Sequence, residues 1–175
     1  MKLRSLVTLM SLLTFLGLVA RAEPLKIGAD APAVSGVTDE GKTLNLADVY
    51  KANDYTLVWF YPKALTGGCT KQGCSLRDGW AEITKRSVAV YGVSVDTQSD
   101  QKAFKEKYHL PFTLLADKEK VVTKAFQAPS LSVAIGYAKR QAYLFEDGKC
   151  IMADYGAPTT EQADKVIKFL DGRKK

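Results

Sequence analysis

The sequence predicts one α/β domain with a central mixed sheet, helices on both faces of the sheet and an added N-terminal hairpin. Strand patterns and helix patterns alternate along most of the chain, and a hairpin pattern and a closing helix follow them. The 175 residues are 46% hydrophobic and 25% charged, which suits a single core of ordinary size. No internal repeat or low-complexity linker divides the region from Leu25 to Leu170.

The first 22 residues have a different character from the rest of the chain. Residues 1–4 are basic, residues 6–20 are almost wholly apolar, and residues 20–22 form a small-x-small cleavage pattern. These features predict a signal peptide at residues 1–22, a mature domain at residues 23–175 and an exported, periplasmic protein without stable membrane association after cleavage. An uncleaved anchor is the alternative, although the apolar run is shorter than the ~20 residues that a membrane span needs.

The basic charge of the chain gives no sign of a nucleic-acid partner. The formal net charge is +6, and Lys2, Arg4 and Arg21 of the predicted signal peptide supply half of it. The remaining basic residues are scattered, without the stripe of basic and aromatic side chains that is typical of nucleic-acid binding. Because no Gly-rich phosphate loop is present either, the sequence implies no nucleotide, flavin or metal cofactor.

The first half of the domain contains one hairpin signal, two signals of buried strands and one helix signal. A turn sequence at residues 39–41, between two short polar–apolar alternations, predicts a hairpin. Residues 55–61 and 87–95 are apolar runs that predict buried strands. Between them, a helix should begin near Cys69 and continue through Ile83, because its apolar residues recur at helical spacing.

The next elements are shorter. Thr97 and Asp100 have the spacing of a capping box and predict a helix that ends near Tyr108. Residues 112–115 predict a short strand, and residues 118–126 predict another helix.

The C-terminal part predicts a hairpin and a closing helix. Asp147-Gly148 is a strong two-residue turn signal between strand patterns at residues 142–146 and 150–155. The last helix should start near Thr159, with Gln162 completing its cap. The complete order of elements matches a thioredoxin-like layout.

A group of residues just after the strand at residues 55–61 indicates chemistry. Pro62, Thr66 and Cys69 follow one another at fixed spacing, and Cys74 lies five residues after Cys69. A cysteine that opens a helix after a Gly-Gly pair lies where free amide groups and the positive end of the helix dipole favour a thiolate. Because the thiolate is the nucleophilic form, the pattern predicts a reactive cysteine.

This segment resembles the active-site loop and helix of peroxiredoxins. Within them, residues 60–78 are similar to the Q-type, or bacterioferritin-comigratory, atypical two-cysteine group. Further matching pieces lie in order around it, at residues 28–32, 39–43, 91–96, 110–117 and 140–145. The resemblance implies an antioxidant thiol peroxidase that reduces hydrogen peroxide and organic hydroperoxides, with a thioredoxin-like dithiol as its reductant.

The resemblance also implies a role for each site residue. Cys69 would attack the terminal oxygen of the peroxide and become a sulfenic acid. Thr66 would offer its hydroxyl to the thiolate and the peroxide, and Pro62 would shield the site from water. Arg140 would stabilise the thiolate and the polarised oxygens, since a leaving oxygen develops negative charge.

The spacing of Cys69 and Cys74 sets a condition on their pairing. Five helical residues rise about 7.5 Å and turn about 140°, whereas a disulfide needs Cα atoms within roughly 7 Å and facing side chains. Either this disulfide never forms, or the first helical turns unwind on oxidation. The resemblance implies the second, with Cys74 resolving the sulfenic acid in the same chain, so we expect a monomer.

Two other functions compete with the peroxidase. A thioredoxin-like thiol–disulfide oxidoreductase is one, but that chemistry usually uses Cys-x-x-Cys. A copper-binding chaperone using Cys69, Cys74 and His109 is the other, although it leaves Pro62 and Thr66 unexplained. The third cysteine, Cys150, follows a turn on a predicted strand, and we expect it to be a small core or edge residue.

Overall fold

The structure is a computed structural model that describes residues 23–128 and 136–173. Within those ranges, one sheet holds seven strands in the order β2-β1-β5-β4-β3-β6-β7. Its strands are β1 (Ser35–Thr38), β2 (Thr43–Asn45), β3 (Tyr55–Phe60), β4 (Val88–Ser94), β5 (Thr113–Ala116), β6 (Gln141–Glu146) and β7 (Lys149–Asp154). The predicted signal peptide at residues 1–22 lies outside the described residues, so its prediction stays untested.

The sheet is mixed, as predicted. β3, β4 and β5 run parallel at its centre. The hairpin of β1 and β2 joins antiparallel beside β5, and β6 and β7 join antiparallel beside β3. The predicted turns carry these hairpins, because Gly41, Asp147 and Gly148 all adopt positive φ angles. The residues between β3 and α2 leave the carboxyl end of the central parallel strands, where open α/β sheets commonly place their sites.

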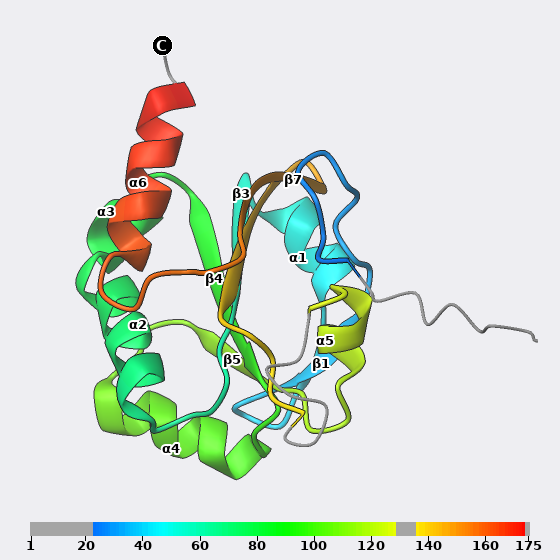
Figure 1. Ribbon diagram of the computed structural model, residues 1–175, viewed down its shortest axis with the longest axis vertical. Helices are drawn as coiled ribbons and strands as arrows, with labels where there is room; N and C mark the ends of the chain where they lie inside the picture. Colours follow the sequence, from blue (N-terminus) through cyan, green and yellow to red (C-terminus); the bar gives the residue numbers. More distant parts are fainter. Residues whose placement is uncertain (1–22, 129–135, 174–175) are drawn as a thin grey trace, which may run out of the picture.

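Helices cover both faces of the sheet, which confirms the predicted α/β architecture (Figure 1). The helices are α1 (Leu46–Ala52), α2 (Gly67–Asp78), α3 (Trp80–Thr84), α4 (Gln98–Tyr108), α5 (Val121–Ala125) and α6 (Gln162–Arg173). Helices α2, α3, α4 and α6 pack on one face, and α1 and α5 pack on the other. None of the helices in the described ranges is long and apolar enough to cross a membrane.

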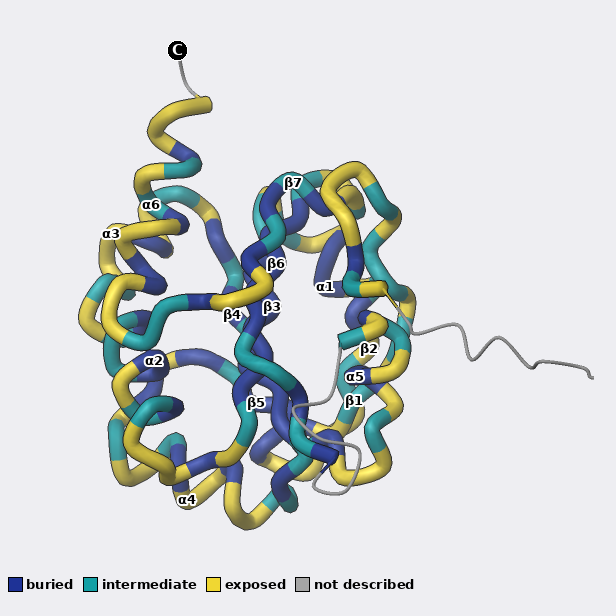
Figure 2. Tube along the Cα trace, viewed as in Figure 1, coloured by how far each residue is buried: buried dark blue, intermediate teal, exposed yellow. Residues whose placement is uncertain are grey.

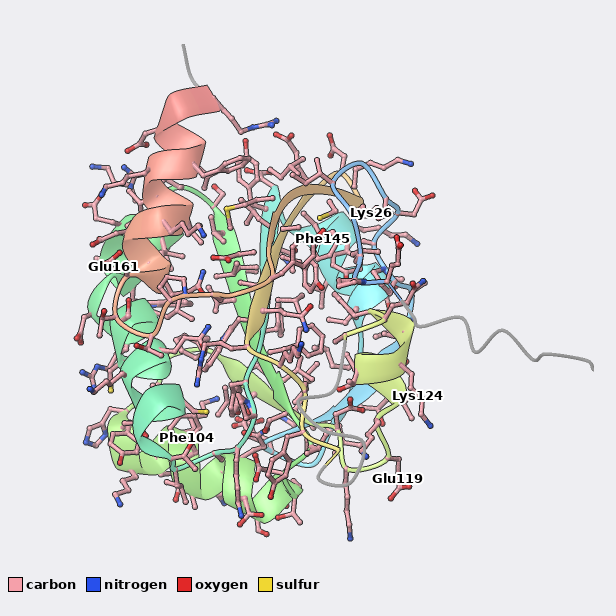
Figure 3. All side chains as sticks on the ribbon, viewed as in Figure 1. Lys26, Phe104, Glu119, Lys124, Phe145 and Glu161 are labelled. Atoms are coloured by element: carbon pink, nitrogen blue, oxygen red, sulfur yellow. The ribbon has the colours of Figure 1, made fainter. Side chains whose placement is uncertain are left out.

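The sheet separates two hydrophobic cores. Along β3, Leu57 and Trp59 belong to the core under α2, whereas Val58 and Phe60 belong to the core under α1, as the period of two residues requires. Figure 2 shows the buried strands between helices whose outer surfaces are exposed. Figure 3 shows Phe104 on the α4 side of the sheet, and Phe145 lies in the opposite core.

One predicted helix is divided into two. The pattern from Cys69 to Ile83 predicts a continuous helix, but Gly79 caps both the end of α2 and the start of α3. A Cβ atom at Gly79 would lie 2.5 Å from the Cβ atom of Ala163. The close approach of α6 therefore requires glycine at this position, and a local periodicity cannot show that requirement.

Two helix boundaries differ from the predicted ones, and one helix was not predicted. The helix predicted from residue 118 begins at Val121, where the Asp117 carboxylate accepts hydrogen bonds from two amides in the first turn of α5. The last helix begins at Gln162 rather than near Thr159. Helix α1, which sequence reasoning missed, begins at Leu46 after the N-cap residue Asn45, whose side chain accepts from the amide of Ala47. By contrast, the capping box of Thr97 and Asp100 is confirmed at the start of α4.

Candidate active site

Cys69 lies in the first turn of α2, directly after the loop that leaves β3. Thr66 is the N-cap residue, and its carbonyl accepts the amide of Thr70 at 2.8 Å. The first amide groups of a helix have no acceptor within the helix and carry the positive end of its dipole. The thiol is 1% exposed and belongs to the core beneath α2. A thiolate at this position is therefore held by peptide dipoles rather than by bulk water.

A guanidinium group adjoins this thiol. Arg140 precedes β6, and the pairing of Phe60 with Gln141 brings it to the end of β3. Its Nη2 lies 3.6 Å from the Sγ of Cys69, and its Nη1 donates to Oε1 of Gln72 at 2.6 Å. An arginine side chain stays charged and offers several donors in a fixed plane. The site thus carries a permanent positive charge beside the sulfur.

The guanidinium of Arg140 occupies space that is free because residue 68 is a glycine. A Cβ atom on Gly68 would lie 3.0 Å from Nη2 of Arg140, closer than most real contacts of this kind. The neighbouring Gly67 faces open space, with nothing within 4 Å of an added Cβ. The two glycines of the motif therefore have different environments.

Sequence reasoning missed two glutamines behind Arg140. Gln72 is fully buried one turn after Cys69, and its Nε2 donates to Oε1 of Gln162 at 3.1 Å. Gln162 is also fully buried at the start of α6, so its side chain does not have the capping role that the sequence suggested. A polar residue three positions after a reactive cysteine lies on the same helical face, and that spacing was the available signal for Gln72. The contact with Gln162 joins positions too far apart for any local signal.

The loop before α2 is fixed by the end of β4. The amide of Ala64 donates to Oδ2 of Asp96 at 2.7 Å, and the Ser94 hydroxyl donates to the same oxygen at 2.6 Å. Pro62 lies in this loop and is partly buried. Leu65, the residue before the N-cap, has a φ of 62° and an exposed side chain. The shielding role expected of Pro62 stays a prediction.

Thr66 is oriented differently from the expectation. Its hydroxyl is exposed and donates to the carbonyl of Lys63 at 2.8 Å. A hydroxyl has one hydrogen to donate, and in this conformation that hydrogen is used in the bond to Lys63. Donation to a thiolate or a peroxide requires rotation of the Thr66 side chain, and the predicted role stays untested.

Cys74 lies on the same helix as Cys69, and both thiols are free. Cys74 is partly buried, while Arg77 one turn later donates to the carbonyl of Tyr108 and pairs with Asp78. Both cysteines occupy regular helix, so the geometric condition derived from their spacing applies to the structure. The helix must open before their sulfur atoms can meet.

Comparison with known proteins places the chain in a family. The model of the AhpC/TSA family matches residues 27–153. The chain belongs to this family. A putative peroxiredoxin bcp of Coxiella burnetii is 41% identical over 102 residues, which cover 58% of this chain and 66% of the relative. Peroxiredoxin bcp1 of Schizosaccharomyces pombe is 34% identical over 148 residues, which cover 83% of this chain and 74% of the relative. The predicted resemblance to the bacterioferritin-comigratory group is therefore confirmed.

Solved structures confirm the fold. Peroxidoxin BcpB from Mycobacterium tuberculosis superposes with a TM-score of 0.77 at 24% identity, covering 85% of this chain and 97% of that one. A mutant of PrxQ from Xylella fastidiosa superposes with a TM-score of 0.78 at 19% identity, covering 87% of this chain and 99% of that one. The AhpC/TSA match and these superpositions agree with the predicted thioredoxin-like layout.

A buried tyrosine near Cys69 stays protonated at neutral pH. Tyr61 is fully buried, stacks on Trp59 with ring centroids 4.4 Å apart and hydrogen-bonds to Gln101. Burial is the main cause that raises the pKa of Tyr61 far above its ordinary value. The phenol therefore supplies neither a charge nor a base near Cys69 at neutral pH.

The remaining candidates lie away from this site. Cys150 is 1% exposed in the core under α1, on the other side of the sheet from Cys69, as expected of a core residue. His109 is exposed in the left-handed C-cap position of α4. In the described ranges, no group of three or more His, Cys, Asp and Glu side chains is placed to hold a metal ion. The geometry therefore gives no support to copper binding by Cys69, Cys74 and His109.

Proposed function

We propose that this chain is a thiol-dependent peroxidase that reduces hydrogen peroxide and organic hydroperoxides through Cys69. The observation that carries the proposal is the 3.6 Å contact between Nη2 of Arg140 and the Sγ of Cys69 in the first turn of α2. The names of the similar proteins, peroxiredoxin bcp and PrxQ, agree with this chemistry.

The first step oxidises Cys69. Its thiolate attacks the terminal oxygen of the hydroperoxide, a sulfur–oxygen bond forms and the oxygen–oxygen bond breaks. The leaving oxygen takes the electron pair and then a proton, giving water or an alcohol. Arg140 stabilises the thiolate before the attack and the negative oxygen during it, and it needs little reorganisation because Gln72 already holds it. Thr66, after rotation of its hydroxyl, would donate to the same oxygens.

The second step uses Cys74. Its thiolate attacks the sulfenic sulfur of Cys69, a disulfide forms and the hydroxyl of the sulfenic acid leaves as water. Because α2 is regular helix around both residues, this step requires unwinding from about Gly67 to Cys74. A dithiol reductant of the thioredoxin type then restores both thiols by exchange. All bonds form within one chain, so a monomer is sufficient.

The proposed cellular location follows from the predicted leader. Residues 1–22 would direct export and be removed before Glu23, so the peroxidase would act in the periplasm and receive electrons from an exported or membrane-coupled dithiol. N-terminal sequencing of the protein from a periplasmic fraction tests this. A mature protein that begins at Glu23 supports the proposal, whereas an intact leader in the cytosol contradicts it.

The activity is tested with the chain that begins at Glu23. Hydrogen peroxide and tert-butyl hydroperoxide are supplied with thioredoxin, thioredoxin reductase and NADPH, and NADPH consumption is recorded. We expect turnover of both peroxides, and its loss in Cys69→Ser. Insulin reduction is measured in the same preparation, because a protein that reduces insulin without consuming peroxide is a thiol–disulfide oxidoreductase instead. Peroxide turnover that persists in Cys69→Ser rejects the assignment of Cys69.

A further inference from the structure

We propose that Gln162 is a positioning residue that acts through Gln72 on Arg140 and controls the balance between oxidation of Cys69 and its resolution by Cys74. The inference rests on the proposed peroxidase function. It starts from a chain of hydrogen bonds that links three elements. Arg140 before β6 donates to Gln72 on α2, and Gln72 donates to Gln162 on α6.

The direction of these bonds is fixed by chemistry. A guanidinium group only donates, so Gln72 must turn its oxygen toward Arg140. Its amide nitrogen then points to Gln162, which must present its own oxygen. Gln162 therefore takes part in this series of hydrogen bonds only as an acceptor. Its Nε2 has no hydrogen-bond partner within the described ranges. Loss of that one acceptor would leave the buried amide of Gln72 unpaired and free to turn.

The position of Arg140 depends on this orientation. One guanidinium nitrogen contacts Sγ of Cys69 and another contacts Gln72, so a rotation of Gln72 moves the group that faces the sulfur. Displacement of a catalytic group by about 1 Å can reduce a rate by as much as 10²-fold. Gln162 thus acts on oxidation without touching the thiol or the peroxide.

The same contact holds the part of α2 that must unwind. Two positions of α2 and its C-cap residue meet the start of α6. Gln72 bonds to Gln162, Ser75 Oγ accepts the amide of Ala163 at 3.3 Å, and Gly79 lies against Ala163. Of these, Gln72 alone lies between Cys69 and Cys74. The other two contacts lie in the part of the helix beyond Cys74, which can stay folded during resolution.

The bond between Gln72 and Gln162 therefore acts on the oxidation of Cys69 and on its resolution by Cys74 in opposite directions. The bond to Gln162 favours the folded site in which Arg140 faces Cys69, and it opposes the unwinding that brings Cys74 to the sulfenic sulfur. Removal of the acceptor should therefore slow oxidation and speed resolution. A general loss of stability in α6 predicts no such opposite change.

The test compares Gln162→Met with Ser75→Ala. Methionine has a similar volume but no carboxamide oxygen. Ser75→Ala removes a neighbouring hydrogen bond between α2 and α6. It leaves the hydrogen bonds that link Gln162, Gln72 and Arg140 in place. The reduced proteins are mixed with hydrogen peroxide, quenched by rapid alkylation and analysed by mass spectrometry, which separates the sulfenic acid of Cys69 from the disulfide.

For Gln162→Met we expect about a tenfold slower oxidation of Cys69 and about a fivefold faster formation of the disulfide. Ser75→Ala should keep the parent rate of oxidation. Gln162→Glu should keep it within about twofold, because a carboxyl oxygen accepts the bond from Gln72 in either protonation state. If Gln162→Met does not fold, Gln162→Asn replaces it, and its shorter side chain should give the same two opposite changes.

Three results would overturn the inference. A folded Gln162→Met protein with both parent rates shows that the chain of bonds has no effect on Arg140. Equal slowing of oxidation in Gln162→Met and Ser75→Ala assigns the effect to packing of α6. A parent protein whose Cys69 does not react with peroxide overturns the proposed function together with this inference, which distinguishes it from the first two results.

Discussion

Cys69 and Cys150 are equally buried, yet their surroundings are opposite. Each is 1% exposed, and the sheet lies between them. Cys69 begins a helix and faces the guanidinium of Arg140. Cys150 lies on β7 beside Tyr50 and Phe145, and its thiol donates to the carbonyl of Met152 at 3.4 Å. Burial alone therefore does not decide which cysteine reacts.

The neighbouring groups make the difference. Burial among apolar side chains disfavours the thiolate and raises the pKa of Cys150 to about 11. At Cys69, the peptide dipoles at the start of α2 and the charged guanidinium of Arg140 lie beside the sulfur atom that would carry the negative charge of a thiolate. The same sheet thus separates a thiol beside a helix start and a guanidinium from a thiol in an apolar core that favours its neutral form. The following predictions test this contrast.

The largest effect should come from removal of the cation. Arg140→Met keeps the length of the side chain but loses its charge and its donors, so the rate constant for oxidation of Cys69 should fall about 10²- to 10³-fold. Lys139→Met is the matched control, since it removes a neighbouring positive charge and should keep the parent rate. Stopped-flow kinetics with hydrogen peroxide measure both. Equal rates in Arg140→Met and the parent would show that the contact with the sulfur has no catalytic role.

The second effect is the protection of Cys150. With a pKa of about 11, its thiolate fraction at pH 8 is about 10²-fold below that of a thiol with the ordinary value of 9.0. Alkylation of Cys150 by iodoacetamide at pH 8 should therefore be at least about 10²-fold slower in the folded protein than in urea. Peptide mass spectrometry follows the reaction, and rapid labelling of Cys150 in the folded state would contradict its assignment to a closed core.

The two glycines before Cys69 give a smaller effect. Gly68→Ala places a methyl group 3.0 Å from Nη2 of Arg140, whereas Gly67→Ala adds the same methyl group in open space. Because both changes favour a helix, their difference isolates the displacement of Arg140. We expect about a tenfold slower oxidation of Cys69 in Gly68→Ala and the parent rate in Gly67→Ala. A similar rate in both variants would mean that the guanidinium moves without cost to the reaction.

The smallest effect concerns alkaline stability. Because the pKa of Cys150 is higher in the folded protein than the ordinary 9.0, the stability that it contributes is complete below about pH 9 and is lost as the pH rises toward 11. From pH 8 to pH 10, the free energy of unfolding should fall about 1 kcal/mol more in the parent than in Cys150→Ala. Urea titrations at the two pH values measure it, and parallel losses in the two proteins would refute the raised pKa.

The sequence predicted those features that depend on neighbouring residues. The apolar run of β3, the capping box at Thr97 and the turn at Asp147 each depend on contacts a few residues apart, and the structure confirms them. The motif around Cys69 is also local. Its position at the start of a helix follows from the glycines and the preceding strand.

The features that sequence reasoning missed depend on distant contacts. The break at Gly79 exists because α6 crosses α2 at Ala163, and the burial of Gln72 has its reason in Gln162. Arg140 was reached only through family resemblance, because no local pattern brings a residue before β6 to a helix that follows β3. Pairing of distant strands, rather than local propensity, completes this site.

The most direct test adds one equivalent of hydrogen peroxide to the reduced chain that begins at Glu23 and maps all three cysteines by mass spectrometry. The contrast between the two buried thiols predicts rapid oxidation of Cys69, conversion to a disulfide with Cys74, and an unmodified Cys150. Oxidation of Cys150, or an unreacted Cys69, would contradict it, because the surroundings of the two sulfur atoms would then not determine which one reacts.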